Sequence, residues 1–144
     1  MTDRAYAPSP IDWVREEVEV YASTGAGRDG RPIVVLETTG AVTGLTRRTP
    51  LMRVEHAGTY AAVASMGGAA SHPAWYANAL RNPEVRLYDG QAVHELVARE
   101  VIGAERARWW SRANGVFPSY ADYQSRTRRP IPVLLLERRL PPTG

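Results

Sequence analysis

The stretch EVRLYDGQAVHELVAREV, residues 84–101, determines how the rest of the chain is interpreted. Apolar and polar residues alternate on both sides of Asp89-Gly90, and such a pair between two alternating runs is a strong signal for a two-residue hairpin turn. We therefore predict two antiparallel strands, 84–89 and 92–101, joined at Asp89-Gly90. The rest of the chain contains further segments of the same kind.

Four other segments have the composition of short strands. They are rich in β-branched residues or alternate in polarity, and two of them are joined by a short Ala57-Gly58 turn. The predicted strands are residues 33–39, 47–56, 57–65 and 131–137. About six strands joined by hairpins, with helices only at the margins, predict a mainly β fold. Its architecture is an antiparallel β-barrel with an N-terminal helix and short covering helices.

The helices are predicted from their start and stop signals. The first has Ser9 as its N-cap and stops at Gly25, and it covers one side of the sheet. Its apolar face consists of Ile11, Val14, Val18 and Tyr21. A short helix starts at Pro73 with Ser71 or His72 as its cap. A longer one ends near residue 115, and a last short one opens at residue 118.

Length and composition restrict the domain organisation and location. The 144 residues predict one domain, 1–144, with a helix and loop over 1–32 and the barrel over 33–140. No apolar run approaches the length of a membrane span, and the N-terminus lacks the apolar core of a signal peptide. A cytoplasmic protein is expected. Peripheral contact of the first helix with a membrane and the oligomeric state both stay open.

Residue usage excludes several classes of chemistry. The chain has no cysteine and no lysine, which excludes disulfides, thiolate metal sites, a cysteine nucleophile, a Schiff-base lysine and a P-loop. The all-arginine basic set is typical of a GC-rich, actinobacterial genome. His56, His72 and His94 are too widely spaced to predict a metal site, and His56 and His94 are expected to face solvent. A net charge of +3 with interleaved acids predicts no nucleic-acid binding.

Three stretches can carry chemistry. In TTGAVTGLTRRTPL, residues 38–51, glycines, threonines and paired arginines form a plausible anion cradle, or else a solvated hairpin loop. In SMGGAASHPAWYAN, residues 65–78, the two glycines would let a flat ligand approach the backbone, beside an aromatic and amide-bearing helix. A tight turn before a core helix explains the same residues equally well. In FPSYADYQ, residues 117–124, an aromatic stripe recurs every three residues.

Together these pieces resemble the deazaflavin (F420)-dependent nitroreductase family. The matching elements are TTGAVTGLTRRTPLMRV at 38–54, YAAVASMGGAASHPAWYANALRNPEV at 60–85, ERARWW at 105–110 and FPSYADYQSRTRRPIPVLLLE at 117–137. The resemblance implies a split β-barrel related to FMN-binding barrels. It also implies that reduced F420 delivers a hydride to a small electron-poor acceptor, namely a quinone, an enone or a nitroaromatic.

The resemblance also assigns roles to residues. Those that match the cofactor-binding positions are Thr43, Gly44, Arg47, Arg48, Thr49, Pro50, Leu51, Met52, Val63, Ala64, Ser65, Met66, Trp75, Tyr76 and Asn78. Those that match the acceptor pocket are Phe117, Tyr120, Tyr123 and Trp75. Tyr120, Tyr123 and Ser65 match the catalytic positions, with Tyr120 expected to orient the acceptor and to donate a proton in competition with solvent.

Departures from the family pattern leave alternatives open. Val42 and Met66 stand where many relatives have basic residues, and Phe117 stands where some nitro-reducing relatives have tyrosine. The first two changes favour a non-catalytic protein that binds deazaflavin, lipid or haem on the same barrel. The third puts nitroimidazole reduction in doubt. FMN in place of F420 is a further alternative.

Overall fold

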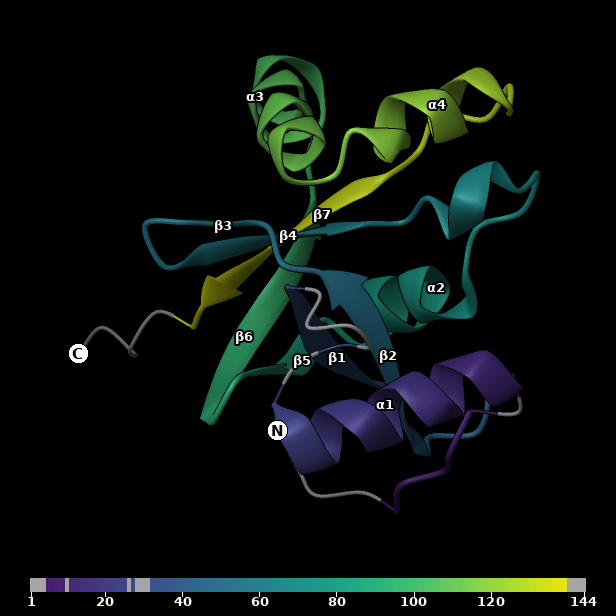
Figure 1. Ribbon diagram of the computed structural model, residues 1–144, viewed down its shortest axis with the longest axis vertical. Helices are drawn as coiled ribbons and strands as arrows, with labels where there is room; N and C mark the ends of the chain where they lie inside the picture. The colour runs from purple at the N-terminus through teal and green to yellow at the C-terminus, as the bar shows by residue number, and fades with distance from the viewer. Residues whose placement is uncertain (1–4, 10, 26, 28–31, 140–144) are drawn as a thin grey trace.

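The computed structural model describes residues 5–9, 11–25, 27 and 32–139, and its strands form one curled antiparallel sheet (Figure 1). The strands are β1 (Ile33–Thr39), β2 (Thr46–Met52), β3 (Glu55–His56), β4 (Thr59–Val63), β5 (Glu84–Asp89), β6 (Ala92–Glu100) and β7 (Val133–Arg138). Their order across the sheet is β2-β1-β5-β6-β7-β4-β3. The predicted mainly β, barrel-like fold is confirmed.

Both predicted hairpins are present, and the β5–β6 turn lies at Gly90 and Gln91, one residue later than predicted. β5 and β6 pair in the register Asp89↔Ala92, and Gly90 in the turn has a φ of 61°. β3 and β4 are joined by Ala57 and Gly58, with φ values of 52° and 84°. In the β3–β4 turn φ is positive at both central positions, and in the β5–β6 turn it is positive at Gly90, the first of the two central residues. Both patterns give the turn a twist that matches that of the strands.

The prediction of one strand over residues 47–56 is wrong, and the reason defines the barrel. β2 pairs with β1 and β3 pairs with β4, and these partners lie at opposite edges of the sheet. The backbone switches partners at two residues: the N–H of Arg53 donates to Pro32, and the carbonyl of Val54 accepts from Ala61. Because only Arg53 and Val54 separate the two edge strands, the sheet must curl until its edges nearly meet.

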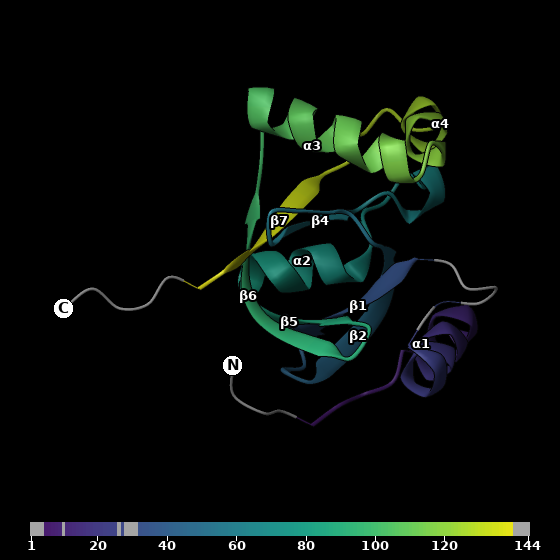
Figure 2. The ribbon, with the colours of Figure 1, turned by 60° about the vertical axis from the view of Figure 1, so that its left-hand side comes forward.

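The helices are α1 (Asp12–Thr24), α2 (Ala74–Arg81), α3 (Gly103–Val116) and α4 (Ser119–Ser125), with a short 3-10 helix η2 (Met66–Gly68). Figure 2 shows α2 within the curl of the sheet and α1 outside it, while α3 and α4 cover the side of β4 and β7. None of the described helices is long and apolar enough to cross a membrane.

The predicted helix caps are only partly correct. α1 begins one residue after its N-cap Ile11, whose N–H donates to Ser9 Oγ, so Ser9 stabilises the preceding turn and not the helix itself. Gly25 ends the helix in the left-handed conformation as predicted, with its N–H bound to the Tyr21 carbonyl. α2 has Pro73 as its N-cap, without the predicted side-chain cap from Ser71 or His72. Pro10 lies outside the described residues.

Strand alternation divides the buried side chains into three layers. The barrel interior contains side chains of β1, β4, β5, β6 and β7 together with Trp75 and Ala79 of α2. A second layer lies between β4, β7 and the helices α3 and α4. A third lies under α1, where Val18 and Tyr21 pack on β1, while Ile11, expected on that face, is exposed. The end of β4 belongs to the first two layers at once.

Candidate functional site

The end of β4 separates the barrel interior from the layer under α3 and α4. Val63 packs into the layer under those helices, whereas Ala64 packs into the barrel interior. Ser65 follows with 8% of its surface exposed, and its hydroxyl has no hydrogen-bond partner among the residues described. No described side-chain N or O atom is both fully buried and unpaired, so this hydroxyl reaches the protein surface. It is available to a ligand.

The turn after β4 has three consecutive residues with positive φ. These are Met66 at 46°, Gly67 at 64° and Gly68 at 81°. A Cβ on Gly68 would lie 2.7 Å from the carbonyl oxygen of Tyr123 in α4, whereas a Cβ on Gly67 would meet nothing within 4 Å. Gly68 is therefore required because α4 approaches the turn, which explains this glycine without a ligand.

The predicted site residues of α2 contact other parts of the protein. Trp75 is 8% exposed in the barrel interior, so it is a core residue. The Tyr76 hydroxyl donates to Glu100 Oε1, and this pairing together with burial raises the pKa of Tyr76 to about 12, with burial the larger cause. Asn78 Oδ1 accepts from the N–H of Ala41 at 3.0 Å and so fixes the β1–β2 loop.

The two predicted arginines of β2 lie on opposite faces of the strand. Arg47 shares its face with Leu51, which packs on the barrel interior, and its guanidinium donates to the Pro8 carbonyl at 2.7 Å. Arg48 faces the α1 side, where its Nε lies 2.9 Å from Glu37 Oε1. Because side chains alternate along a strand, one ligand on one face of β2 cannot contact both guanidinium groups there.

Arg48 neutralises a buried carboxylate. The Glu37 side chain is only 4% exposed and is also contacted by Arg86 at 3.5 Å and by the Tyr88 hydroxyl at 3.1 Å. The Arg48 guanidinium lies over the rings of Tyr6 and Tyr88 at 4.5 and 5.0 Å. These contacts leave Arg47 as the arginine of the pair better placed to meet an anionic ligand.

The aromatic stripe on α4 forms a cluster beside the end of β4. Phe117, Tyr120 and Tyr123 lie with ring centroids 5.0 to 6.4 Å apart, in the same layer as Val63 and Met52. Burial, followed by the neighbouring Tyr123, raises the pKa of the Tyr120 hydroxyl. Within the described part of the chain that hydroxyl has no partner, and like Ser65 it reaches the surface.

Arg129 is a residue of this region that the sequence did not single out. Its guanidinium donates to the carbonyls of Ala64, Ser65 and Ala69 at 3.1, 2.7 and 2.7 Å. It also lies 2.9 Å from Nδ1 of His72. Arg129 stands in an arginine-rich run, SRTRRP, in which nothing local distinguishes it from its neighbours. Only the long-range contacts reveal what it binds.

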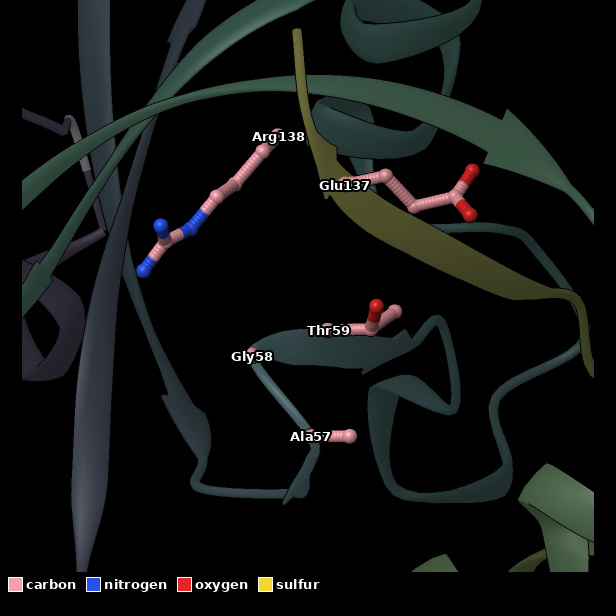
Figure 3. Close-up of a pocket in the computed structure, with 5 residues that line it drawn as sticks. All are labelled: Ala57, Gly58, Thr59, Glu137 and Arg138. Atoms are coloured by element: carbon pink, nitrogen blue, oxygen red, sulfur yellow. The ribbon is translucent and has the colours of Figure 1, made fainter. Parts of the chain in front are cut away.

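The other end of the barrel has a different character. A surface pocket of about 560 Å³ is lined by Ala57, Gly58, Thr59, Glu137 and Arg138 (Figure 3). These residues lie where β4 begins and β7 ends, so the pocket is at the opposite end of β4 from Ser65. It contains none of the predicted site residues.

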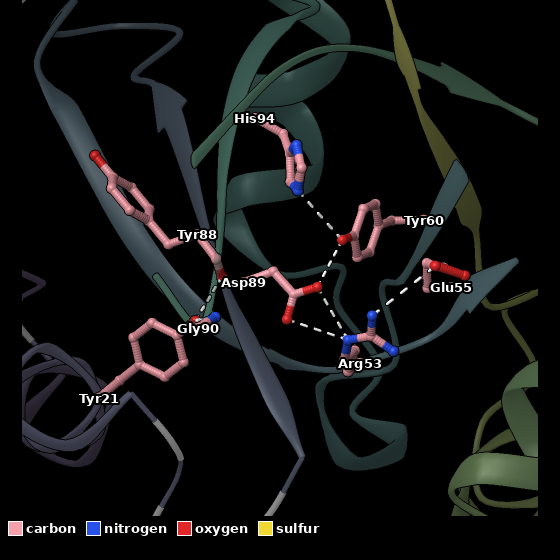
Figure 4. A network of polar contacts seen from close by, with 8 residues as sticks. All are labelled: Tyr21, Arg53, Glu55, Tyr60, Tyr88, Asp89, Gly90 and His94. Carbon is pink, nitrogen blue, oxygen red and sulfur yellow. Dashed lines mark hydrogen bonds and ion pairs between the residues drawn. The ribbon is translucent and has the colours of Figure 1, made fainter. Parts of the chain in front are cut away.

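A polar network lies at that same end of the barrel (Figure 4). Arg53 donates to both carboxylate oxygens of Asp89, and the Tyr60 hydroxyl donates to Asp89 at 2.6 Å. His94 lies 3.5 Å from that hydroxyl and is half-buried, so its expected solvent-facing position is wrong, while His56 is exposed as expected. Burial, with Asp89 as the next cause, raises the pKa of Tyr60 to about 12. The network joins the β2–β3 link to β4, β5 and β6.

The structure brings the predicted site residues together in two groups. One group packs under α3 and α4 and consists of Met52, Val63, Phe117, Tyr120 and Tyr123. The other packs in or against the barrel interior and consists of Leu51, Ala64, Trp75 and Tyr76. Val42, Thr43 and Met66 are exposed, and Gly44, Thr49 and Pro50 are half-buried. Among the described residues there is no group of three or more His, Asp or Glu side chains that could hold a metal ion.

A curled antiparallel barrel with unpaired hydroxyls and an aromatic group at one strand end is an arrangement that can bind a flat ligand. Residues 13–138 match the family model described as F420H(2)-dependent quinone reductase, and the chain belongs to that family. It is therefore an F420H2-dependent oxidoreductase that uses coenzyme F420, as the resemblance implied.

Individual relatives agree with this assignment. The F420H(2)-dependent quinone reductase Rv1261c of Mycobacterium tuberculosis is 40% identical over 138 residues, which cover 90% of this chain and 92% of that protein. A solved structure of an F420-H2 dependent reductase, FDR-A, is 51% identical with a TM-score of 0.71, covering 74% of this chain and 95% of that one. A further structure, a domain-swapped dimer, is 48% identical with a TM-score of 0.72, covering 90% and 100%.

Proposed function

We propose that this enzyme reduces a small quinone with F420H2, and that the reaction takes place between the end of β4 and the aromatic cluster of α4. The observation that carries the proposal is the unpaired Tyr120 hydroxyl beside Phe117 and Tyr123. Aromatic walls with one polar donor suit a flat ring that bears a carbonyl oxygen. The name of the mycobacterial relative supports a quinone over the enone and nitroaromatic acceptors.

The residues on the page fit the cofactor. Arg47 donates to a main-chain carbonyl, so its charge stays available to a phosphate, and Thr49 lies on the same face of β2. Ser65 offers its hydroxyl at the end of β4 to the edge of a ring. When bound, reduced F420 supplies a hydride, which is one proton and two electrons. Arg48, which is paired with Glu37, supports the strand and does not contact the cofactor.

Reduction of a quinone to a quinol needs one further proton beyond the hydride. Because burial raises the pKa of Tyr120, its hydroxyl stays protonated at neutral pH and is a poor acid. Its role is to donate a hydrogen bond to the acceptor oxygen as negative charge develops there. The quinol anion left by hydride addition takes this proton from water, because an ordinary phenol, with a pKa of about 10, is protonated at neutral pH. Tyr123 packs on Tyr120 and aligns that hydroxyl.

The partners follow from the same arrangement. F420 and a small-molecule acceptor are the ligands proposed, and no nucleic acid is involved. A cytoplasmic location is proposed, with contact between the first helix and a membrane surface as a peripheral attachment. Because Trp13 on α1 is 61% exposed, it is the residue available for such a contact.

The proposal is tested by titrating the purified protein with F420 and, in parallel, with FMN, and then by assaying F420H2 oxidation with quinones. Saturable binding of F420 and quinone-dependent turnover are expected. Binding of FMN alone, or of neither, would refute the proposal, and the latter would favour a non-catalytic binder of lipid or haem.

Tyr120→Phe separates the acceptor site from the cofactor site. Losing one hydrogen bond to a developing charge should lower kcat about tenfold or more while the affinity for F420 changes little. Tyr123→Phe, made at the neighbouring ring, should retain most of the turnover. Equal kcat values in the wild type and Tyr120→Phe would remove that hydroxyl from the reaction.

A further inference from the structure

The turn that follows β4 is weakly held by its own backbone. Met66, Gly67 and Gly68 all have positive φ, and for Met66 this is a conformation that side chains disfavour. Within the turn only two main-chain hydrogen bonds form, from Gly68 to Ser65 and from Ala69 to Met66. Such a turn persists only where its surroundings determine its shape.

Arg129, which lies in a distant part of the sequence, determines the shape of this turn. Its three guanidinium nitrogens reach carbonyls on both sides of the turn: Ala64 and Ser65 before it, and Ala69 after it. Because a guanidinium is a rigid planar fork, these bonds fix the separation of the two ends of the turn. The same group donates to Nδ1 of His72, which extends the hold toward α2.

The position of Arg129 is itself fixed by α4. The side chain of Gln124 donates to the Arg129 carbonyl and accepts from the N–H of Ile131, each at 2.9 Å. The segment that carries the guanidinium is thereby attached to the helix that bears Tyr120. No carboxylate pairs with Arg129 in the described structure, and burial lowers the pKa of its guanidinium. Its partners are peptide carbonyls and His72, as expected of a group that shapes the backbone.

We propose that Arg129 is a positioning residue for hydride transfer, which holds the Ser65–Ala69 turn at a fixed place relative to the aromatic cluster of α4. This inference rests on the proposed function, because it takes the turn as the wall for the deazaflavin and α4 as the wall for the acceptor. Without the guanidinium the turn relaxes, and the cofactor and acceptor lose their alignment, although neither touches Arg129.

The test compares Arg129→Ala and Arg129→Lys with the control Arg128→Ala, an adjacent exposed arginine. The measurements are kcat, KM for F420H2, affinity for F420 and melting temperature. Arg129→Ala should lose about tenfold to a hundredfold in kcat/KM, the loss expected for displacement of reacting groups by about 1 Å. Millimolar guanidinium should restore part of it. Arg129→Lys should stay impaired because an ammonium cannot bridge the three carbonyls, and Arg128→Ala should match the wild type.

The outcomes distinguish this inference from the proposed function. An inactive wild-type enzyme, with no quinone-dependent oxidation of F420H2, would refute the proposed function before any variant is compared. An active wild type with unchanged kinetics in Arg129→Ala would overturn the positioning role alone. Should Arg129→Ala fail to fold, a folded Arg129→Lys with wild-type kcat and KM overturns it equally. Loss of stability without loss of kcat/KM in the folded fraction would make Arg129 purely structural, and that also overturns it.

Discussion

Arg48→Met should destabilise the fold and leave the affinity for F420 nearly unchanged. Arg47→Met should weaken F420 binding and leave the stability of the fold nearly unchanged. The reason is the alternation along β2. Arg48 lies 2.9 Å from the carboxylate of Glu37, which is 4% exposed, and Arg47 binds only a main-chain carbonyl near the surface. Adjacent, identical side chains therefore act on two different properties.

The size of the stability loss follows from what remains around Glu37. Removing one partner of a fully buried ion pair costs about 3–5 kcal/mol. Arg48 is 32% exposed, and Arg86 and the Tyr88 hydroxyl still contact the carboxylate, so we expect about 2 kcal/mol. With an unfolding entropy of about 2.1 cal/mol/K per residue over 144 residues, this lowers the melting temperature by about 7 °C.

The assay combines thermal unfolding, denaturant unfolding and F420 titration at two salt concentrations. Arg47→Met should shift the melting temperature by no more than about 2 °C, because exposed contacts contribute little. It should weaken F420 binding, and the difference from wild type should shrink at high salt, because exposed charges are screened. Arg48→Met should bind F420 with nearly wild-type affinity at a temperature where it is folded.

The reasoning fails if Arg48→Met shows the loss of F420 affinity, and Arg47→Met the loss of stability. Weak F420 binding by folded Arg48→Met, with an unchanged melting temperature, would mean that the guanidinium leaves Glu37 to bind the cofactor. Equal losses of affinity in both variants would mean that the ligand contacts both faces of β2.

Two other predictions concern the turn and the polar network. Gly68→Ala should destabilise the fold by about 3 kcal/mol, through the contact with Tyr123 and the positive φ, whereas Gly58→Ala, with nothing within 4 Å, should cost only about 1 kcal/mol in denaturant unfolding. Because the pKa of Tyr60 is raised to about 12, the folded state holds that proton more tightly than the unfolded chain does. The resulting stability is complete below about pH 10 and is lost as the pH rises toward about 12, so urea midpoints should fall less steeply over that range in Tyr60→Phe than in wild type. A wild-type midpoint that does not fall there would contradict this assignment.

The sequence was sufficient for the local parts of the fold. The β5–β6 hairpin and the turn at Ala57-Gly58 are encoded by residues next to one another, and both hairpins were predicted, the first with its turn one residue too early. The break at Arg53-Val54 was missed because an alternating run looks the same whether it pairs with one neighbour or with two. Which strand each half joins depends on β1 and β4, which lie next to opposite edges of the sheet.

The segments of the candidate site could be named from the sequence, whereas the contacts that their side chains make could not. Motif spacing indicated the segments around Ser65 and Tyr120, whose roles stay predictions. It could not show that Arg48 faces a buried carboxylate, because the pairing partner Glu37 lies on another strand. Nor could it identify Arg129, whose partners are carbonyls about sixty residues away and carry no side-chain signature. The single-domain boundaries likewise stay a prediction.

The place of β7 in the sheet has a consequence for how the chain matures. β7 lies between β6 and β4, yet it is synthesised after both, so β4 and β6 each have an unpaired edge until residues 133–138 leave the ribosome. Unpaired strand edges can recruit other chains. The barrel therefore completes itself only after β7 has been synthesised, and until then the edges of β4 and β6 are open to pairing with other chains.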